Sequence, residues 1–188
     1  MSDRTLITHC SPTLAGMKTG NLFSCRYSSS DQLYGFAVKW NEELNPRGVH
    51  VRVMRACNGM ALIYVYRKIK LEKELQDSKV KSFMENRGYN CRDIGEMLNL
   101  LAERLQKNGG FPHEIGVFLG YPFEDVREFI TNKGRNYKLV GHWKVYCNEH
   151  AARQMFNKYD KCTDVYRKKL DDGAKLCRLT VKDNLICP

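Results

Sequence analysis

The stretch that decides the fold is VHVRVMRACNGMALIYVYR, residues Val49–Arg67. Two segments rich in β-branched and aromatic residues, the types that favour strands, lie on either side of Asn58-Gly59. Asn and Gly supply the two positive-φ residues of a type I′ turn, which joins two antiparallel strands directly. The stretch therefore predicts a β-hairpin.

The turn also predicts which residues of the two strands face each other. With regular pairing, Val53 lies opposite Tyr64 and Val51 lies opposite Tyr66. These side chains would share one face of the hairpin, because alternate residues of a strand point the same way. Half of the hairpin must then face a core.

Two further strands are predicted outside the hairpin. Thr5–His9 has the apolar pair Leu6-Ile7 and is soon followed by Pro12, which stops regular strand pairing. The segment 12–23 is then predicted as a turn or a short helix. Trp143–Cys147 is the second predicted strand, and both strands are expected to join the hairpin in one sheet.

The remaining apolar residues recur mainly at helical spacing. They predict helices that span, in chain order, about 31–44, 69–88, 92–107, 112–119, 122–132 and 149–170. Gly88 and Gly109-Gly110 stand where the second and third of these helices would end, since glycine suits a helix C-cap. The predicted fold class is α+β, with a small, largely antiparallel sheet that includes the hairpin at about 49–67 and is covered by five or more helices.

Composition places the chain among ordinary globular proteins. Its 188 residues suit a single domain over 1–188, and 43% are hydrophobic while 28% are charged. The longest apolar run, Met60–Tyr66, is far shorter than the roughly 20 residues that span a bilayer, and the N-terminal sequence lacks the pattern of a signal peptide. We expect a soluble, cytoplasmic protein that makes no membrane contact.

The eight cysteines stand singly and form no C-x-x-C pair. This spacing is not that of a zinc ribbon or a dithiol oxidoreductase, so no metal site is predicted. Free thiols in a reducing compartment are the simplest interpretation. The sequence identifies no cofactor.

The formal net charge of +10 favours an anionic ligand or partner. The basic residues are spread along the chain rather than gathered in a tail, as on a solvated surface. Nucleic acid is therefore a possible partner but not the favoured one.

The first candidate site lies at a predicted strand-to-helix junction and contains His9, Cys10, Lys18 and Asn21. Backbone N–H groups at a helix start can receive an anion, Lys18 adds positive charge, and the same field can turn Cys10 into a nucleophilic thiolate. The order is not that of a P-loop. The alternative is a buried strand end followed by a turn of purely structural importance.

The second candidate site is His113-Glu114, at the start of a predicted short helix. A histidine and a glutamate there can form a proton-transfer pair, although a structural histidine is the commoner case. No second histidine follows at the spacing of a zinc protease. The catalytic candidates are thus Cys10, His113 and Glu114.

Residues 113–132 also have the pattern of a helix-turn-helix. Gly120 would form the turn, Gly116 the close contact, and Val126 and Phe129 the packed side of the second helix. That second helix is net negative, whereas a helix that reads DNA must approach phosphates. A packed helical corner is the favoured interpretation.

The segment 133–169 is basic and contains aromatic residues, a combination that suits single-stranded nucleic acid. Its helical part places Phe156, Tyr159 and Tyr166 on an apolar stripe, which assigns them to the core. The basic face of this segment remains a candidate surface for nucleic acid.

Three blocks of sequence carry a resemblance to a known family: His9–Lys18, then Phe111–Pro122 with Asp125-Val126, and Trp143–Tyr146. In this order and spacing they resemble a family from anaerobic, largely clostridial bacteria that is catalogued as a domain of unknown function. The resemblance covers nearly the whole chain. It implies a bacterial cytoplasmic setting and implies no mechanism.

The leading functional hypothesis is a cytoplasmic protein or enzyme that binds a small anionic ligand. One site would contain the six candidates from both junctions: His9, Cys10, Lys18, Asn21, His113 and Glu114. The first alternative is a nucleic-acid-binding or regulatory protein that uses the corner at 113–132 and the basic C-terminal face. The second is an adaptor that docks another protein through an exposed apolar patch.

Overall fold

The structure is a computed structural model that describes residues 2–107 and 111–183. It divides into two compact units, Met1–Ile69 with Tyr159–Pro188 and Lys70–Lys158. A single domain over 1–188 stays a prediction. The predicted helix end at Gly109-Gly110 lies outside the described residues.

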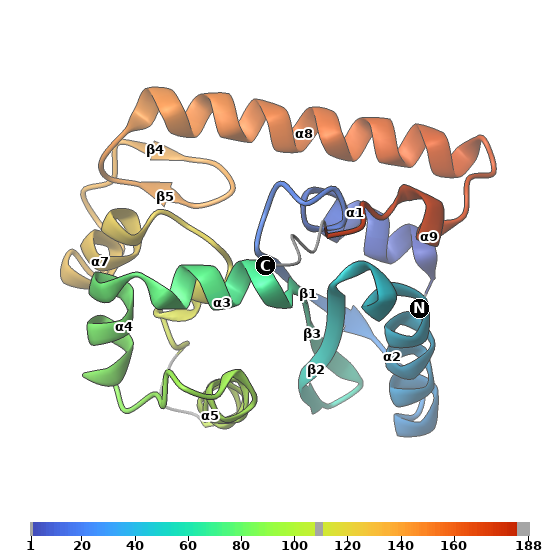
Figure 1. The fold of residues 1–188 in the computed structure, drawn as a ribbon, viewed down its shortest axis with the longest axis horizontal. Helices are drawn as coiled ribbons and strands as arrows, with labels where there is room; N and C mark the ends of the chain where they lie inside the picture. Colours follow the sequence, from blue (N-terminus) through green and yellow to red (C-terminus); the bar gives the residue numbers. More distant parts are fainter. Residues whose placement is uncertain (1, 108–110, 184–188) are drawn as a thin grey trace, which may run out of the picture. The chain divides into compact units, whose positions relative to one another are not determined.

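The first unit contains a three-stranded antiparallel sheet (Figure 1). Its strands are β1 (Gly20–Arg26), β2 (Val49–Cys57) and β3 (Met60–Arg67), in the order β1-β3-β2. Asn58 and Gly59 have φ values of 49° and 72°, as the turn between β2 and β3 requires. The predicted hairpin and the α+β class are confirmed.

The predicted register of the hairpin is wrong by one residue at Val53 and Val51, the part of β2 that lies farther from the turn. Val53 pairs with Ile63 and Val51 with Val65, because a bulge between Val53 and Arg55 inserts an extra residue into β2. Val51, Ile63 and Val65 therefore belong to the core of this unit. A one-residue shift exchanges the two faces of a strand, and no feature of the turn predicts it.

The predicted strand at Thr5–His9 is part of a helix, α1 (Asp3–Leu14). Ser2 caps this helix by accepting a hydrogen bond from the Thr5 backbone N–H. Its buried apolar residues, Leu6, Ile7, Cys10 and Leu14, lie on one helical face. The third strand of the sheet is instead β1, which falls partly within the segment predicted as a turn or short helix.

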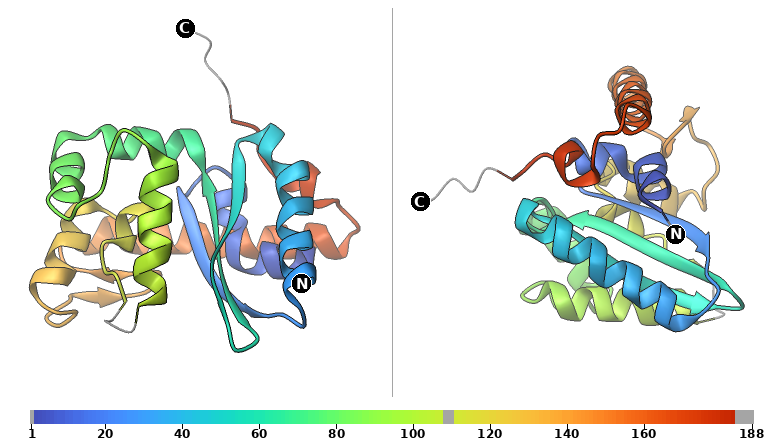
Figure 2. Two further views of the ribbon diagram at one scale, coloured as in Figure 1. Left: turned by 90° about the horizontal axis from the view of Figure 1, so that it is seen from below. Right: turned by 90° about the vertical axis from the view of Figure 1, so that its right-hand side faces the viewer.

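Helix α2 (Ser30–Leu44) matches its predicted range and lies beside β2 (Figure 2). Ser29 accepts a hydrogen bond from the Gln32 backbone N–H and caps the helix. The side chain of Asn41 both donates to the Val51 carbonyl and accepts from the Val51 N–H, each at 2.8 Å. This amide completes the hydrogen bonds of β2 on its outer edge.

Three shorter elements complete the first unit. They are η1 (Asn45–Arg47), α9 (Leu176–Leu179) and residues 159–171 of α8 (Glu149–Asp171). The core of the unit packs one face of the sheet against α1, α2 and α9.

One buried cation, Arg67, joins distant parts of the first unit. Its side chain is 1% exposed and donates to the carbonyls of Thr13 and Leu14, each at 2.6 Å, and of Val181 at 2.8 Å. It also pairs with the Asp183 carboxylate. These partners satisfy a charge that would be costly to bury alone.

The second unit is mainly helical. Its elements are most of α3 (Lys68–Gln76), α4 (Ser78–Glu85), α5 (Ile94–Gln106), α6 (Ile115–Phe118), α7 (Phe123–Thr131), β4 (Leu139–Val140), β5 (Lys144–Val145) and residues 149–158 of α8. The predicted helix at 69–88 is two helices, because Asp77 accepts from the Lys79 and Val80 N–H groups and caps α4. The predicted strand near 143–147 exists as β5, but it pairs with β4 and not with the hairpin's sheet.

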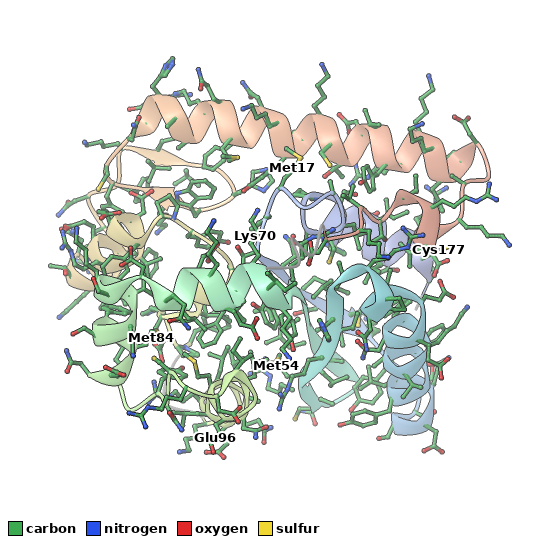
Figure 3. The ribbon with its side chains drawn as sticks, viewed as in Figure 1. Met17, Met54, Lys70, Met84, Glu96 and Cys177 are labelled. Atoms are coloured by element: carbon green, nitrogen blue, oxygen red, sulfur yellow. The ribbon has the colours of Figure 1, made fainter. Side chains whose placement is uncertain are left out.

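Helices α4 and α5 of the second unit each bury one apolar stripe. Met84 of α4 is fully buried, whereas Glu96 of α5 lies on the surface (Figure 3). The buried side of α5 consists of Met97, Leu98, Leu101 and Leu105. Within 2–107 and 111–183, no helix is both long and apolar enough to cross a bilayer.

Candidate ligand-binding site

A cavity of about 240 Å³ in the second unit lies at the α6–α7 corner and the β4–β5 hairpin. We call it the aromatic pocket. Its lining residues are Phe111, His113, Ile115, Gly116, Leu119, Tyr121, Asp125, Val126, Phe129, His142, Trp143 and Lys144. Apolar and aromatic side chains predominate, with a few polar groups among them, which is the usual composition of a small-molecule site.

The corner that forms one wall of the aromatic pocket depends on two glycines. Gly120 has a φ of 69° and lies between α6 and α7, and the Tyr121 N–H donates to the Gly116 carbonyl at 2.9 Å. A Cβ on Gly116 would lie 2.7 Å from a methyl carbon of Val126. The predicted roles of Gly116 and Gly120 in a packed corner agree with this geometry.

Asp125, in the first turn of α7, fixes the wall of the aromatic pocket that lies opposite the corner. It is 3% exposed, and its Oδ1 accepts hydrogen bonds from the backbone N–H groups of Tyr146 at 2.8 Å and Cys147 at 3.0 Å. Its Oδ2 accepts from the Trp143 indole Nε1 at 2.8 Å. The carboxylate therefore ties the segment around β5 to the corner and fixes the Trp143 ring in the pocket wall.

The rings of the aromatic pocket support one another. Tyr121 stacks on Trp143 with centroids 5.3 Å apart, and Phe156 meets Trp143 edge-on at 4.5 Å. On the other side, His113 meets Phe129 at 5.0 Å and an interplanar angle of 66°. Such contacts hold flat surfaces in place, so the pocket presents rigid walls.

The polar groups of the aromatic pocket are mostly cationic or neutral. The Lys144 Nζ donates to the Gly134 carbonyl at 2.8 Å and lies 4.8 Å from the centre of the Tyr137 ring. Burial raises the pKa of Tyr121 to about 12, so its hydroxyl is uncharged at neutral pH. His113 and His142 add two imidazoles to the lining.

Glu114 forms a partly buried ion pair with Arg104. Its Oε1 accepts from Arg104 at 2.5 Å and from the Tyr89 hydroxyl at 3.0 Å. Burial alone would raise the pKa of Glu114, but a backbone hydrogen bond, the bonds from Arg104 and Tyr89 and the Arg104 charge hold it below its ordinary value. Glu114 is thus an ionised structural group, and its catalytic assignment stays a prediction.

The four N-terminal candidates lie in the first unit, where α1 ends and β1 begins. Asn21 accepts a hydrogen bond from the Thr13 hydroxyl at 2.7 Å. His9 stacks on Phe23 at 4.9 Å, and its pKa is lowered mainly by burial. These contacts show that the side chains of Asn21 and His9 pack within the fold of the first unit.

Cys10 and Lys18 are both buried in the first unit. Burial raises the pKa of the Cys10 thiol despite the nearby Lys18 charge, which keeps it protonated at neutral pH. Burial also lowers the pKa of Lys18 to about 8, against the opposing effect of Cys10. A thiolate nucleophile at Cys10 finds no support in this environment.

The six predicted site residues divide between the two units. His9, Cys10, Lys18 and Asn21 belong to the first unit, and His113-Glu114 to the second. Only His113 of these lines the aromatic pocket. A single site that contains all six stays a prediction.

A model of a family described as proteins of unknown function, DUF3793, matches residues 6–180. The chain belongs to this family. No curated protein and no solved structure matches the sequence significantly. The DUF3793 match includes the aromatic pocket as well as the N-terminal candidates, and it assigns a role to neither.

Sequence reasoning missed that Phe129, His142, Trp143 and Lys144 converge with His113 in this DUF3793 protein. The spacing of Gly116, Gly120 and Val126 did indicate the corner, but β4–β5 is too short to give a strong strand signal. The usable signal was Asp125, an acid on the packed side of a predicted helix, since a buried carboxylate requires donors from elsewhere in the fold.

Proposed function

We propose that this protein binds a small molecule that has a flat, apolar body and a negative charge, and that the aromatic pocket is its binding site. The observation that carries the proposal is the cavity of about 240 Å³ with walls formed by Tyr121, Phe129 and Trp143. Flat ligands stack on such rings with little loss of conformational entropy in the protein, because the rings are already held by their neighbours.

The charge of the proposed ligand follows from the polar groups around the pocket. Asp125 is a carboxylate in the lining, and its oxygens already accept three hydrogen bonds. Lys144 and two histidines contribute cationic or donor groups. A ligand anion is therefore better accommodated than a ligand cation, in agreement with the net charge of +10.

The nucleic-acid alternative finds less support in the α6–α7 corner. Helix α6 has only four residues, and α7 carries Glu124 and Asp125 in its first turn. A recognition helix needs donors at its N-terminal end where it meets the bases, and phosphates repel carboxylates there. That alternative then rests on the basic face of the C-terminal segment, and the adaptor hypothesis stays a prediction.

The cellular setting belongs to the same proposal. A bacterial cytoplasm suits a chain whose cysteines stand singly in sequence. A soluble metabolite that carries a negative charge is a common component of that compartment. Of the three catalytic candidates from the sequence, His113 is the one that lines the pocket.

The test is native mass spectrometry on the full chain purified without oxygen, compared with its denatured mass. A filling variant, His113→Trp, is measured beside a matched control, His150→Trp, whose site is an exposed position on α8. The proposal expects a reproducible excess mass in the wild type and the control that is lost in His113→Trp.

Two results would contradict the proposal. One is an excess mass that His113→Trp retains in full, since the bound molecule would then occupy another site. The other is a bare polypeptide mass together with no binding of 2-naphthoate, a flat anionic probe, at millimolar concentration in isothermal titration calorimetry. Circular dichroism of the variants checks that the fold is retained.

A further inference from the structure

A second hollow, of about 360 Å³, lies next to the aromatic pocket in the second unit. We call it the cationic hollow. Its lining residues are Arg87, Arg104, Lys107, Phe111, Pro112, His113, Glu114 and Ile130. Phe111 and His113 line both the cationic hollow and the aromatic pocket, so the two cavities adjoin at these side chains.

The cationic hollow has more positive than negative charge. Its single acid among the lining residues, Glu114, is already bound by Arg104 and Tyr89. In the part of the chain that the structure describes, no carboxylate forms an ion pair with Arg87 or Lys107. Two cations thus face a cavity without an anion of the protein to neutralise them.

The two arginines are also held in position. The Arg87 guanidinium lies 3.6 Å from the centre of the Phe83 ring and donates to the Phe83 carbonyl at 3.1 Å. Arg104 donates to the Arg87 carbonyl at 2.5 Å and lies over the Tyr89 ring at 4.6 Å. Each guanidinium has five N–H donors, so Arg87 keeps several for a ligand while its position is already fixed.

We propose that the aromatic pocket and the cationic hollow are two halves of one site, and that the ligand class is an aromatic acid. The flat body lies in the aromatic pocket, and a carboxylate or phosphate group passes His113 and is held by Arg87 and Lys107. This inference rests on the proposed function and specifies its ligand. Oxyanions are the groups that the fork of an arginine binds in bidentate geometry.

His113 has a defined place in this arrangement. It contacts Phe129 of the aromatic pocket with its ring and borders the cationic hollow as well. An imidazole N–H at this junction can donate to the acid group of a ligand that occupies both cavities. In this proposal His113, from the second candidate site predicted from the sequence, takes part in ligand recognition rather than in catalysis.

The experiment compares three probes on the full chain by isothermal titration calorimetry. They are 2-naphthoate, 2-naphthyl phosphate and the neutral 2-naphthylmethanol, which share one flat body. The test variant is Arg87→Met with Lys107→Met, which removes two charges and leaves the Arg104–Glu114 pair intact. The matched control is Arg92→Met with Lys158→Met, at two exposed positions of the same unit.

We expect at least one acidic probe to bind the wild type and the control more tightly than the neutral probe does. In the test variant, its affinity falls by about 10-fold or more, because the charge-assisted hydrogen bonds from Arg87 and Lys107 to the acid group are lost. The affinity of 2-naphthylmethanol stays unchanged. Whichever of the two acidic probes binds more tightly shows whether the site prefers a carboxylate or a phosphate.

The contrary outcomes separate the two proposals. If the acidic probes bind and the test variant binds them as well as the wild type, the cationic hollow plays no part and this inference is overturned, while the proposed function stands. If none of the three probes binds at millimolar concentration, the flat-body pocket itself is disproved and both proposals fall.

Discussion

The indole nitrogen of Trp143 donates a hydrogen bond to the carboxylate of Asp125 at 2.8 Å. Asp125 is the residue that links α7 to the segment around β5, because its other oxygen accepts two backbone N–H groups from Tyr146 and Cys147. One side chain therefore determines where the largest ring of the aromatic pocket lies. The stability of the second unit and the shape of the proposed site depend on the same carboxylate.

We first predict that Asp125→Ala destabilises the protein strongly. Three donors lose their acceptor in a region where Asp125 is only 3% exposed, at a cost of about 2–4 kcal/mol. Urea unfolding followed by circular dichroism measures the loss. Asp172→Ala, at an exposed position, is the control and should change stability by less than about 0.5 kcal/mol. Equal stability of the two variants would refute the assigned role.

The second prediction concerns the contact between Gly116 and Val126. Gly116→Ala places a Cβ 2.7 Å from a Val126 methyl carbon, and we expect a loss of about 1–3 kcal/mol from overpacking. In the Gly116→Ala, Val126→Ala double variant the total loss should be smaller than the sum of the two single losses. Gly35→Ala is the control, since nothing lies within 4 Å of its Cβ, and it should be neutral or slightly stabilising. Strict additivity would argue against a tight contact.

The third prediction is a pH dependence that Glu114 produces. Its pKa in the folded protein lies below the ordinary value of 4.5, so its ion pair contributes stability above about pH 4.5 and loses it as the pH falls through the lower, folded-state pKa. Glu114→Gln should therefore be less stable than the wild type at pH 7, and the difference should shrink in acid. Urea unfolding from pH 3 to pH 7 measures both, with Glu42→Gln as an exposed control. A difference that grows in acid would contradict the direction of the shift.

The fourth prediction addresses the edge of the three-stranded sheet. Asn41→Ala removes both hydrogen bonds to the Val51 backbone and should cost about 1–2 kcal/mol. Asn157→Ala removes the same side chain from an exposed position on α8 and should have little effect. Hydrogen exchange adds a second readout, because the Val51 amide should exchange faster in Asn41→Ala alone. An unchanged rate at Val51 would show that the amide is protected in another way.

Local signals in the sequence predicted most of the elements correctly. The turn at Asn58-Gly59 and the apolar stripe of α8 depend on residues close together in the chain, so their own chemistry suffices. The strand predicted at Thr5–His9 was wrong because the apolar pair Leu6-Ile7 is compatible with both a strand and a helix. The helix is selected by Cys10 and Leu14, which complete the buried face.

Features that depend on distant residues could not be predicted in the same way. The bulge in β2 moves the pairing of Val53 from Tyr64 to Ile63, and the turn residues contain no information about it. The cationic hollow combines Arg87, which precedes a helix-capping glycine, with Arg104 of α5. Their spacing in the sequence does not indicate that the two arginines lie close together, because the distance between them depends on the loop that connects them.

Arg67 has a consequence for the order of events during synthesis. Its carbonyl partners at Thr13, Leu14 and Val181 come from nearly opposite ends of the sequence. Residues 70–158, the continuous unit, are therefore synthesised before Val181, the last of these three partners. A chain truncated before Val181 keeps the Thr13 and Leu14 carbonyls as partners of Arg67 but lacks Val181 and Asp183, so proteases should cleave its first unit more readily than that of the full chain.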